Sequence, residues 1–195
     1  MKKGKNFSCN NEGKRKKSDF YETPYSITKQ FLELESIPSE WSVLEPASGS
    51  GAMTKIIKEF SNNVTEYKFE EGQDFLIKKE TFDFIITNPP FSLAYEFIQK
   101  AKQIATHKFA FLLPLSYLHG KTRFDEIWSD RNFLLSHIYV FVRYPMLGNK
   151  LRIDGKYKTG MMVYAWYVWD KDTINKEPVI KWIDNHKYVI GARHE

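Results

Sequence analysis

Hydrophobic residues along the chain alternate between short continuous runs and longer stretches in which they recur every three or four positions. Continuous short runs are typical of strands buried on both faces of a sheet, and the wider spacing is typical of amphipathic helices. The pattern predicts strands at 41–44, 64–67, 82–87, 109–113, 138–142 and 161–169. It predicts helices at 25–37, 52–60 and 94–104, and a partly helical polar stretch at 121–136.

The order of these elements predicts an α/β protein with a doubly wound sheet. Strands alternate with helices, and then two strands follow in succession, which indicates seven mostly parallel strands with a C-terminal antiparallel pair. We expect the strand at 82–87 to be the fourth of the sheet and the strand at 109–113 to be the fifth. We expect one domain over residues 18–195, without a separate target-recognition domain, after a disordered basic tail over residues 1–17.

Length and composition limit the class of protein. A chain of 195 residues with 42% hydrophobic residues suits one globular domain. No apolar run approaches the ~20 residues of a membrane span, and the polar N-terminus does not resemble a signal peptide. The single cysteine, Cys9, excludes an internal disulfide, and the five histidines show no ligand spacing. A cytoplasmic location and no metal site are therefore expected.

The net charge of +5 is unevenly distributed along the chain. Residues 1–17 hold seven basic residues and one acidic residue, whereas the remaining 178 residues hold 22 basic and 23 acidic ones. The basic character therefore belongs to the tail, which could contact phosphates or only serve as a solubilising arm.

The stretch Asn88-Pro89-Pro90-Phe91 follows the apolar run at 82–87. Two prolines end a strand because neither can donate a ladder hydrogen bond. Asn88 is thereby placed at the carboxyl end of a central strand, where open α/β sheets bind ligands. Its side-chain oxygen and the Pro89 carbonyl could accept both hydrogens of an exocyclic amine, and Phe91 could stack on a base. The alternative is a strand that merely ends in a Pro-Pro turn.

A glycine-rich turn, Glu45-Pro46-Ala47-Ser48-Gly49-Ser50-Gly51, follows the first predicted strand and indicates a nucleotide site. The dinucleotide pattern fails because Thr54 stands where its third glycine is required, and no phosphate loop ending in Gly-Lys-Ser/Thr is present. The carboxylate of Glu45 would repel a pyrophosphate. It would attract the positive amino and sulfonium groups of S-adenosylmethionine.

Together, the tetrapeptide at 88–91 and the turn at 45–51 resemble the catalytic and cofactor motifs of the adenine-N6 DNA methyltransferases, particularly small phage-like members. The turn departs from the usual Asp-Pro-x-x-Gly-x-Gly in having glutamate at its first position. The resemblance covers about residues 18–183. It implies a Rossmann-like methyltransferase fold and direct methyl transfer from S-adenosylmethionine to the N6 amine of a flipped-out adenine.

The resemblance also implies roles for individual residues. The catalytic residues would be Asn88, Pro89, Pro90 and Phe91. The cofactor would be bound by Tyr21, Thr23, Pro24, Glu45, Pro46, Ala47, Gly49, Gly51, Glu66, Tyr67, Asp74, Phe75 and Asn88. Within this set, Glu66 would bind the ribose, with Glu70 and Glu71 as alternatives, and Tyr67 would stack on the cofactor adenine. Thr23 could instead cap a helix, and Asp74 could be a simple turn residue.

The densest positive stretch outside the tail is the segment 143–160, which is predicted to contact double-stranded DNA or else to be a solvated hairpin. Its basic residues are Arg143, Lys150, Arg152, Lys156 and Lys158. Residues 114–136 and 143–160 would read a short target sequence. Two alternatives remain open. The chain could carry out the same methyl transfer on RNA or on a protein glutamine, or it could be a cofactor-binding or DNA-binding subunit without turnover.

Overall fold

The computed structural model describes residues 22–142, 163–174 and 177–184. The predicted basic tail over 1–17, the cofactor residue Tyr21 and the basic segment 143–160 lie outside these residues. The predictions attached to them stay predictions.

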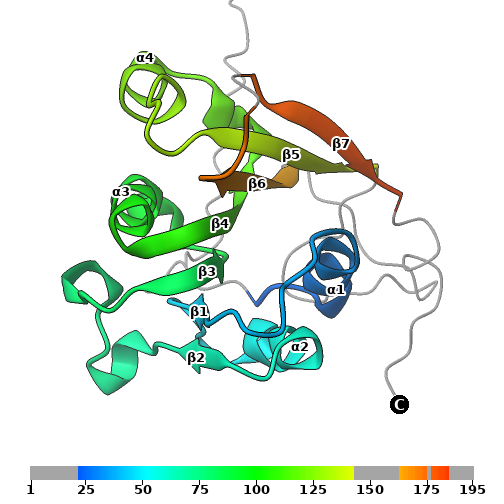
Figure 1. Cartoon of the computed structure of the whole chain (residues 1–195), viewed down its shortest axis with the longest axis vertical. Helices are drawn as coiled ribbons and strands as arrows, with labels where there is room; N and C mark the ends of the chain where they lie inside the picture. The colour runs from blue at the N-terminus through cyan, green and yellow to red at the C-terminus, as the bar shows by residue number, and fades with distance from the viewer. Residues whose placement is uncertain (1–21, 143–162, 175–176, 185–195) are drawn as a thin grey trace, which may run out of the picture.

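Seven strands form one mixed sheet in the order β2-β1-β3-β4-β6-β5-β7 (Figure 1). Neighbours from β2 to β4 are parallel, β6 is antiparallel to both β4 and β5, and β7 is parallel to β5. The strands are β1 Val43–Glu45, β2 Val64–Glu66, β3 Phe82–Thr87, β4 Ala105–Pro114, β5 Leu135–Phe141, β6 Tyr164–Asp170 and β7 Val179–Ile183.

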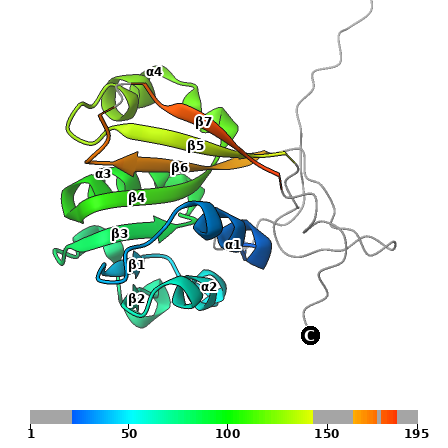
Figure 2. The same cartoon turned by 45° about the vertical axis from the view of Figure 1, so that its right-hand side comes forward.

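Helices cover both faces of the sheet, so the fold has three layers (Figure 2). Helices α1 (Tyr25–Leu34) and α2 (Ala52–Phe60) pack on one face, and α3 (Ala94–Ile104) packs on the other. The second face also holds the short α4 (Lys121–Arg123), which continues into a π-helical turn. Short 3₁₀ turns occur at Phe69–Glu71, Phe75–Ile77, Phe91–Leu93 and Leu115–Leu118.

The core follows from the two-residue alternation of the strands. In β3, Phe84 and Ile86 pack toward α1 and α2, whereas Ile85 packs toward α3. The aromatic residues of β6 divide in the same way: Trp166 stacks on Phe31 of α1 with ring centres 4.5 Å apart, and Trp169 faces the α3 side. Burial on both faces explains why these strands have nearly continuous apolar sequences.

The predicted fold class is confirmed, including the antiparallel neighbours near the C-terminus. The strand numbering was wrong, because Phe82–Thr87 is the third strand along the chain and not the fourth. No strand forms between β2 and β3, where Gly72 has a φ of +76° and Asp74 starts a 3₁₀ turn. The seventh strand is instead β7, whose β-branched and aromatic sequence could have predicted it.

Helix α1 ends at Leu34, three residues before the predicted end, and Glu35 is extended. The buried carboxylate of Glu35 accepts hydrogen bonds from Lys108 Nζ (2.5 Å) and Tyr139 OH (2.9 Å), and its Oε2 lies 2.8 Å from His137 Nε2. Burial alone would raise the pKa of Glu35, but the contacts with His137 and Lys108 outweigh it and lower the pKa to about 2. This buried cluster attaches the end of α1 to β4 and β5.

None of the helices in the described part of the chain is long and apolar enough to cross a membrane.

Candidate active site

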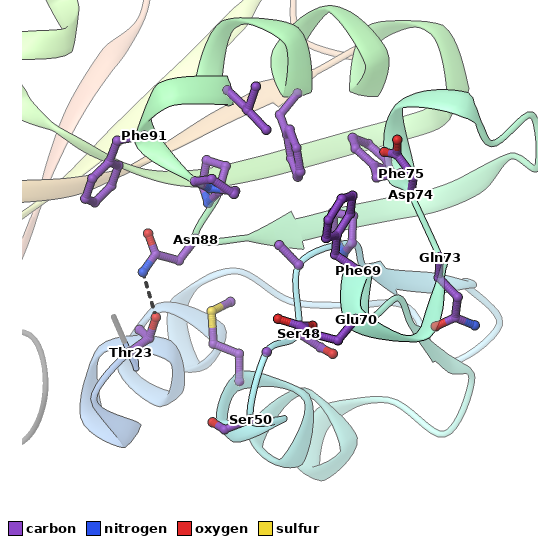
Figure 3. A pocket seen from close by; sticks show the side chains of 18 of the residues that line it. Thr23, Ser48, Ser50, Phe69, Glu70, Gln73, Asp74, Phe75, Asn88 and Phe91 are labelled. Carbon is purple, nitrogen blue, oxygen red and sulfur yellow. Dashed lines mark hydrogen bonds between the residues drawn. The ribbon is translucent and has the colours of Figure 1, made fainter. Parts of the chain in front are cut away.

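A cavity of about 560 Å³ opens at the carboxyl ends of β1 and β3 (Figure 3). From β1 the chain turns toward β2, and β3 lies on the other side, so the cavity is at the switch point of the sheet. The described residues that line it include three carboxylates, Glu22, Glu70 and Asp74, and no lysine, arginine or histidine.

The glycine-rich turn forms one wall of this cavity. Gly51 has a φ of +79° at the N-cap of α2, a conformation that favours glycine, and a Cβ there would lie 3.7 Å from Glu66 Oε2. The turn is closed by a hydrogen bond from the Gly51 amide to the Ser48 carbonyl (2.7 Å). The Ser48 hydroxyl lines the cavity, is buried and has no partner among the described residues.

Glu45 lies beneath the turn and does not line the cavity. Its Oε1 accepts hydrogen bonds from the Ala47 amide (2.9 Å) and the Thr87 hydroxyl (2.6 Å). The side chain is buried, and this burial raises the pKa of Glu45 to about 8. Glu45 therefore holds the turn against β3 and carries little negative charge at neutral pH. The acidic residues that line the cavity are Glu22, Glu70 and Asp74.

Of the acidic residues after β2, the structure brings Glu70 to the cavity and not Glu66. Glu66 forms an ion pair with Lys68 (3.5 Å). Burial acts to raise the pKa of Glu66, but the Thr54 hydroxyl and Lys68 outweigh it and lower the pKa. Glu70, the alternative for the ribose contact, therefore lines the cavity, whereas Glu66 lies next to the turn, with its Oε2 3.7 Å from where a Cβ on Gly51 would be.

Of the two aromatic residues near the end of β2, Phe69 lines the cavity and Tyr67 does not. Tyr67 is buried and donates a hydrogen bond to Glu80, whereas Phe69 lines the cavity and is 74% exposed (Figure 3). Sequence reasoning missed Phe69. Its signal was an aromatic residue directly before the acidic pair at 70–71, just beyond the predicted second strand.

Asp74 and Phe75 both line the cavity. One oxygen of Asp74 accepts a hydrogen bond from the Leu76 amide (2.9 Å), so Asp74 is a turn-forming residue as well as a cavity residue. Phe75 packs on Phe97 of α3 with ring centres 4.9 Å apart, which fixes one face of the cavity to the hydrophobic core.

Asn88 lies directly after β3, at the inner end of the cavity (Figure 3). Its Nδ2 donates a hydrogen bond to Thr23 Oγ1 (3.0 Å). Its Oδ1 is buried and has no partner among the described residues. The predicted capping role of Thr23 was wrong, because the N-cap of α1 is Pro24 and has no side-chain cap.

Pro89, Pro90 and Phe91 also line the cavity. The Phe91 ring stacks on Tyr164 of β6, with ring centres 5.4 Å apart and planes 25° apart. Tyr164 of β6 thus supports the ring of Phe91.

The cavity brings together many, but not all, of the residues predicted from the sequence. Those that line it are Thr23, Pro46, Ala47, Gly49, Asp74, Phe75, Asn88, Pro89, Pro90 and Phe91. The predicted residues that lie in the described part of the chain but do not line the cavity are Pro24, Glu45, Gly51, Glu66 and Tyr67. Lining residues that sequence reasoning missed include Glu22, Ser48, Met53, Phe69, Gln73 and Leu93. No group of three or more histidine, cysteine or acidic side chains suited to a metal ion occurs in residues 22–142, 163–174 and 177–184.

No protein-family model and no curated protein matches the chain. Solved structures do. A protein named as a modification subunit of a type I restriction enzyme from Vibrio vulnificus is 15% identical over 84% of this chain and 47% of its own, with a TM-score of 0.59. The M protein of the type I restriction enzyme EcoKI is 13% identical over 80% of this chain and 45% of its own, with a TM-score of 0.55. This chain spans about half the length of these two structures.

A protein from Pyrococcus horikoshii named as an RNA methyltransferase is 18% identical over 77% of this chain and 86% of its own, with a TM-score of 0.50. At these identities, the likenesses establish the fold. The chain has the Rossmann-like fold of the methyltransferases, with its cavity at the carboxyl edge of the sheet.

Proposed function

We propose that the chain transfers a methyl group from S-adenosylmethionine to the exocyclic N6 amine of adenine in DNA. The observation that carries this proposal is Asn88, which lines the cavity at the end of β3 and whose side-chain oxygen is buried without a partner among the described residues. A buried acceptor without a donor is costly, and a substrate amino group would supply the missing donor.

The charge of the cavity fits this cofactor. S-adenosylmethionine supplies an electrophilic methyl group on a positively charged sulfonium. Three lining carboxylates and no lining cation favour a positive ligand over a pyrophosphate, in the described residues. Glu70 would bind the ribose, and Phe69 and Phe75 would contact the adenine of the cofactor.

The tetrapeptide would act on the amine. Asn88 Oδ1 and the Pro89 carbonyl would each accept one N–H of the target amine, while Phe91 would stack on the base. An aromatic amine is a weak nucleophile, since its lone pair is delocalised into the ring. Accepting both hydrogens stabilises the positive charge that develops on nitrogen during attack. No covalent enzyme intermediate is required.

The base would be flipped out of the duplex to reach a cavity of this kind. The DNA backbone would be contacted by the basic residues Arg143, Lys150, Arg152, Lys156 and Lys158. A short target sequence would be read by residues 114–136 and 143–160. The basic residues favour nucleic acid over protein, but the same chemistry on RNA is tested in parallel.

The test is a tritiated methyl-transfer assay with the full chain on separate pools of DNA, RNA and protein. We expect label in DNA at adenine N6. Asn88→Ala should reduce transfer at least about 100-fold with little change in cofactor affinity, because it removes an acceptor that acts in the transition state. Asn62→Ala, a change of an exposed asparagine after α2, is the matched control and should retain full activity.

Label in RNA or protein alone would overturn the DNA assignment. No label in any pool would overturn the enzymatic function. Full activity in Asn88→Ala would overturn the catalytic role of the tetrapeptide.

A further inference from the structure

The segment that precedes α1 contacts two separate parts of the cavity. Glu22 Oε1 accepts a hydrogen bond from the Ser50 hydroxyl (3.1 Å) in the glycine-rich turn. Thr23 Oγ1 accepts one from Asn88 Nδ2 (3.0 Å) at the end of β3. Both Glu22 and Thr23 line the cavity, and Thr23 is only 6% exposed. Figure 3 shows the hydrogen bond between Thr23 and Asn88 to one side of the other lining side chains.

This contact matters because an asparagine amide carries an oxygen that accepts hydrogen bonds and a nitrogen that donates them. The terminal torsion of the amide has two broad, nearly equivalent orientations that exchange oxygen and nitrogen. Only the orientation with nitrogen toward Thr23 leaves Oδ1 free to accept from a substrate amine. A threonine hydroxyl can accept from Nδ2 or donate to Oδ1, so Thr23 alone could pair with either orientation. Once a substrate amine lies on the other side of the amide, only the orientation with Nδ2 toward Thr23 pairs both ends, because Oδ1 then accepts from the amine and Thr23 accepts from Nδ2.

The same contact gains strength during the reaction. As the target amine becomes more positive, Oδ1 accepts from it more strongly, and the amide becomes more polarised. A polarised amide is a better donor through its nitrogen, so its hydrogen bond to Thr23 strengthens as well. An interaction that strengthens toward the transition state raises the rate of the chemical step more than the affinity for ligands.

We propose that Thr23 is a positioning residue that holds the Asn88 amide with its oxygen toward the substrate amine. The inference rests on the proposed function. Thr23 acts through Asn88 and need not touch the reacting atoms. Its own position is well supported, because α1 begins two residues later and is attached at its far end through the contacts of Glu35 with β4 and β5.

The test compares three variants of the full chain. Thr23→Val keeps the shape of the side chain and removes the acceptor, and Thr23→Ser keeps the hydroxyl. Thr28→Val is the matched control, since Thr28 is also buried in this part of the chain, but its hydroxyl has no partner among the described residues and it does not line the cavity.

In Thr23→Val, we expect kcat to fall about 10-fold to 100-fold, as is typical when a reacting group loses its alignment. The dissociation constant for S-adenosylmethionine, measured by calorimetry, distinguishes this role from the cofactor contact that the resemblance implies for Thr23. It should change less than about threefold, since the lost contact acts in the chemical step. Thr23→Ser should restore most of kcat, and Thr28→Val should match the wild type. An unchanged kcat in Thr23→Val, or a loss of cofactor affinity that accounts for the whole defect, would overturn the inference.

A second measurement does not depend on activity. The side-chain amide resonances of Asn88 in ¹⁵N-labelled protein should shift in Thr23→Val and keep their positions in Thr28→Val. If the wild type transfers no methyl group to any pool, the proposed function fails. The contact between Thr23 and Asn88 is then judged by these resonances alone, and unchanged resonances would overturn it.

Discussion

The two edges of the sheet each hold a buried glutamate, and the two residues differ in what surrounds them. At the amino edge, Glu35 has Lys108, His137 and Tyr139 as partners, and its pKa falls to about 2. At the carboxyl edge, Glu45 has two neutral donors and no cation, and its pKa rises to about 8.

The difference separates a structural region from a binding region. Around Glu35, the buried charges have partners within the chain. Among the residues that line the cavity, Ser48 Oγ and Asn88 Oδ1 are buried without partners among the described residues. Buried polar groups are normally paired, so the carboxyl edge has the character of a site that is completed by a ligand. Helix α1 connects the two regions, from Thr23 at one edge to Glu35 at the other.

The largest effect on stability is expected from the amino edge. Glu35→Gln removes the carboxylate between Lys108 and His137 and leaves Lys108 only its longer ion pair with Asp170 (3.5 Å), which should lower the free energy of unfolding by about 2 kcal/mol at pH 7. Urea denaturation measures this loss. Methyl transfer by the folded variant at low temperature should remain close to that of the wild type, because Glu35 lies far from the cavity in the fold.

The effect of Glu35 should depend on pH. Its folded pKa is below the ordinary value of 4.5, so its contribution is present above about 4.5 and is lost as pH falls toward about 2. The difference in the free energy of unfolding between the wild type and Glu35→Gln should therefore become smaller as the pH falls. Glu33→Gln, on the exposed side of the same helix, is the control. An equal loss of stability in both variants would contradict the assigned role of the buried cluster.

The second effect on stability is expected at the carboxyl edge, where replacing Glu45 should stabilise the fold, whereas replacing Glu35 should destabilise it. The folded pKa of Glu45 lies above its ordinary value of 4.5, so the folded state holds this proton more tightly than the unfolded chain does. Glu45 should therefore destabilise the fold increasingly as pH rises from about 4.5 to about 8. Glu45→Gln mimics the protonated form and should gain stability relative to the wild type over this interval. Thermal unfolding without cofactor at several pH values measures this gain in stability. If the stability difference between Glu45→Gln and the wild type does not change with pH over this interval, Glu45 is ionised in the folded protein.

The smallest effect is expected on the affinity for S-adenosylmethionine, and it tests whether Phe69 or Tyr67 contacts the cofactor. Phe69→Ala should weaken binding of S-adenosylmethionine by roughly 10-fold, within the range for stacking of an aromatic ring on a base. Ile77→Ala, an equally exposed apolar residue that does not line the cavity, should leave the affinity unchanged. Tyr67→Leu, which removes the ring, should also leave the affinity of the folded protein unchanged. If Tyr67→Leu weakens binding and Phe69→Ala does not, the original assignment to Tyr67 is the correct one.

Much of the fold could be predicted because its signals are local. The apolar runs of β3, β4 and β6 result from burial on both faces, and the Pro89-Pro90 pair fixes where β3 ends. These two facts also placed Asn88 at the correct edge of the sheet. The glycine-rich turn was located in the same way, because Gly51 has the positive φ that the turn requires.

The remaining features depend on partners that are distant in sequence. Thr23-Pro24 fits a helix start by its local pattern, but the partner of Thr23 is Asn88, 65 residues away. Glu45 was expected to be charged, and its burial depends on Thr87 in another strand. Two aromatic residues, Tyr67 and Phe69, flank the end of β2, and only the 3₁₀ turn at Phe69–Glu71 determines which one reaches the cavity.

The hydrogen bond between Thr23 and Asn88 has a practical consequence for protein engineering. A shortened gene product that begins at Tyr25 would keep every helix and strand described above and give an ordinary circular dichroism spectrum. It would nevertheless lack the threonine that we assign to the alignment of the catalytic amide. Secondary-structure content is therefore a poor criterion for choosing where to trim, tag or fuse this protein near its N-terminus.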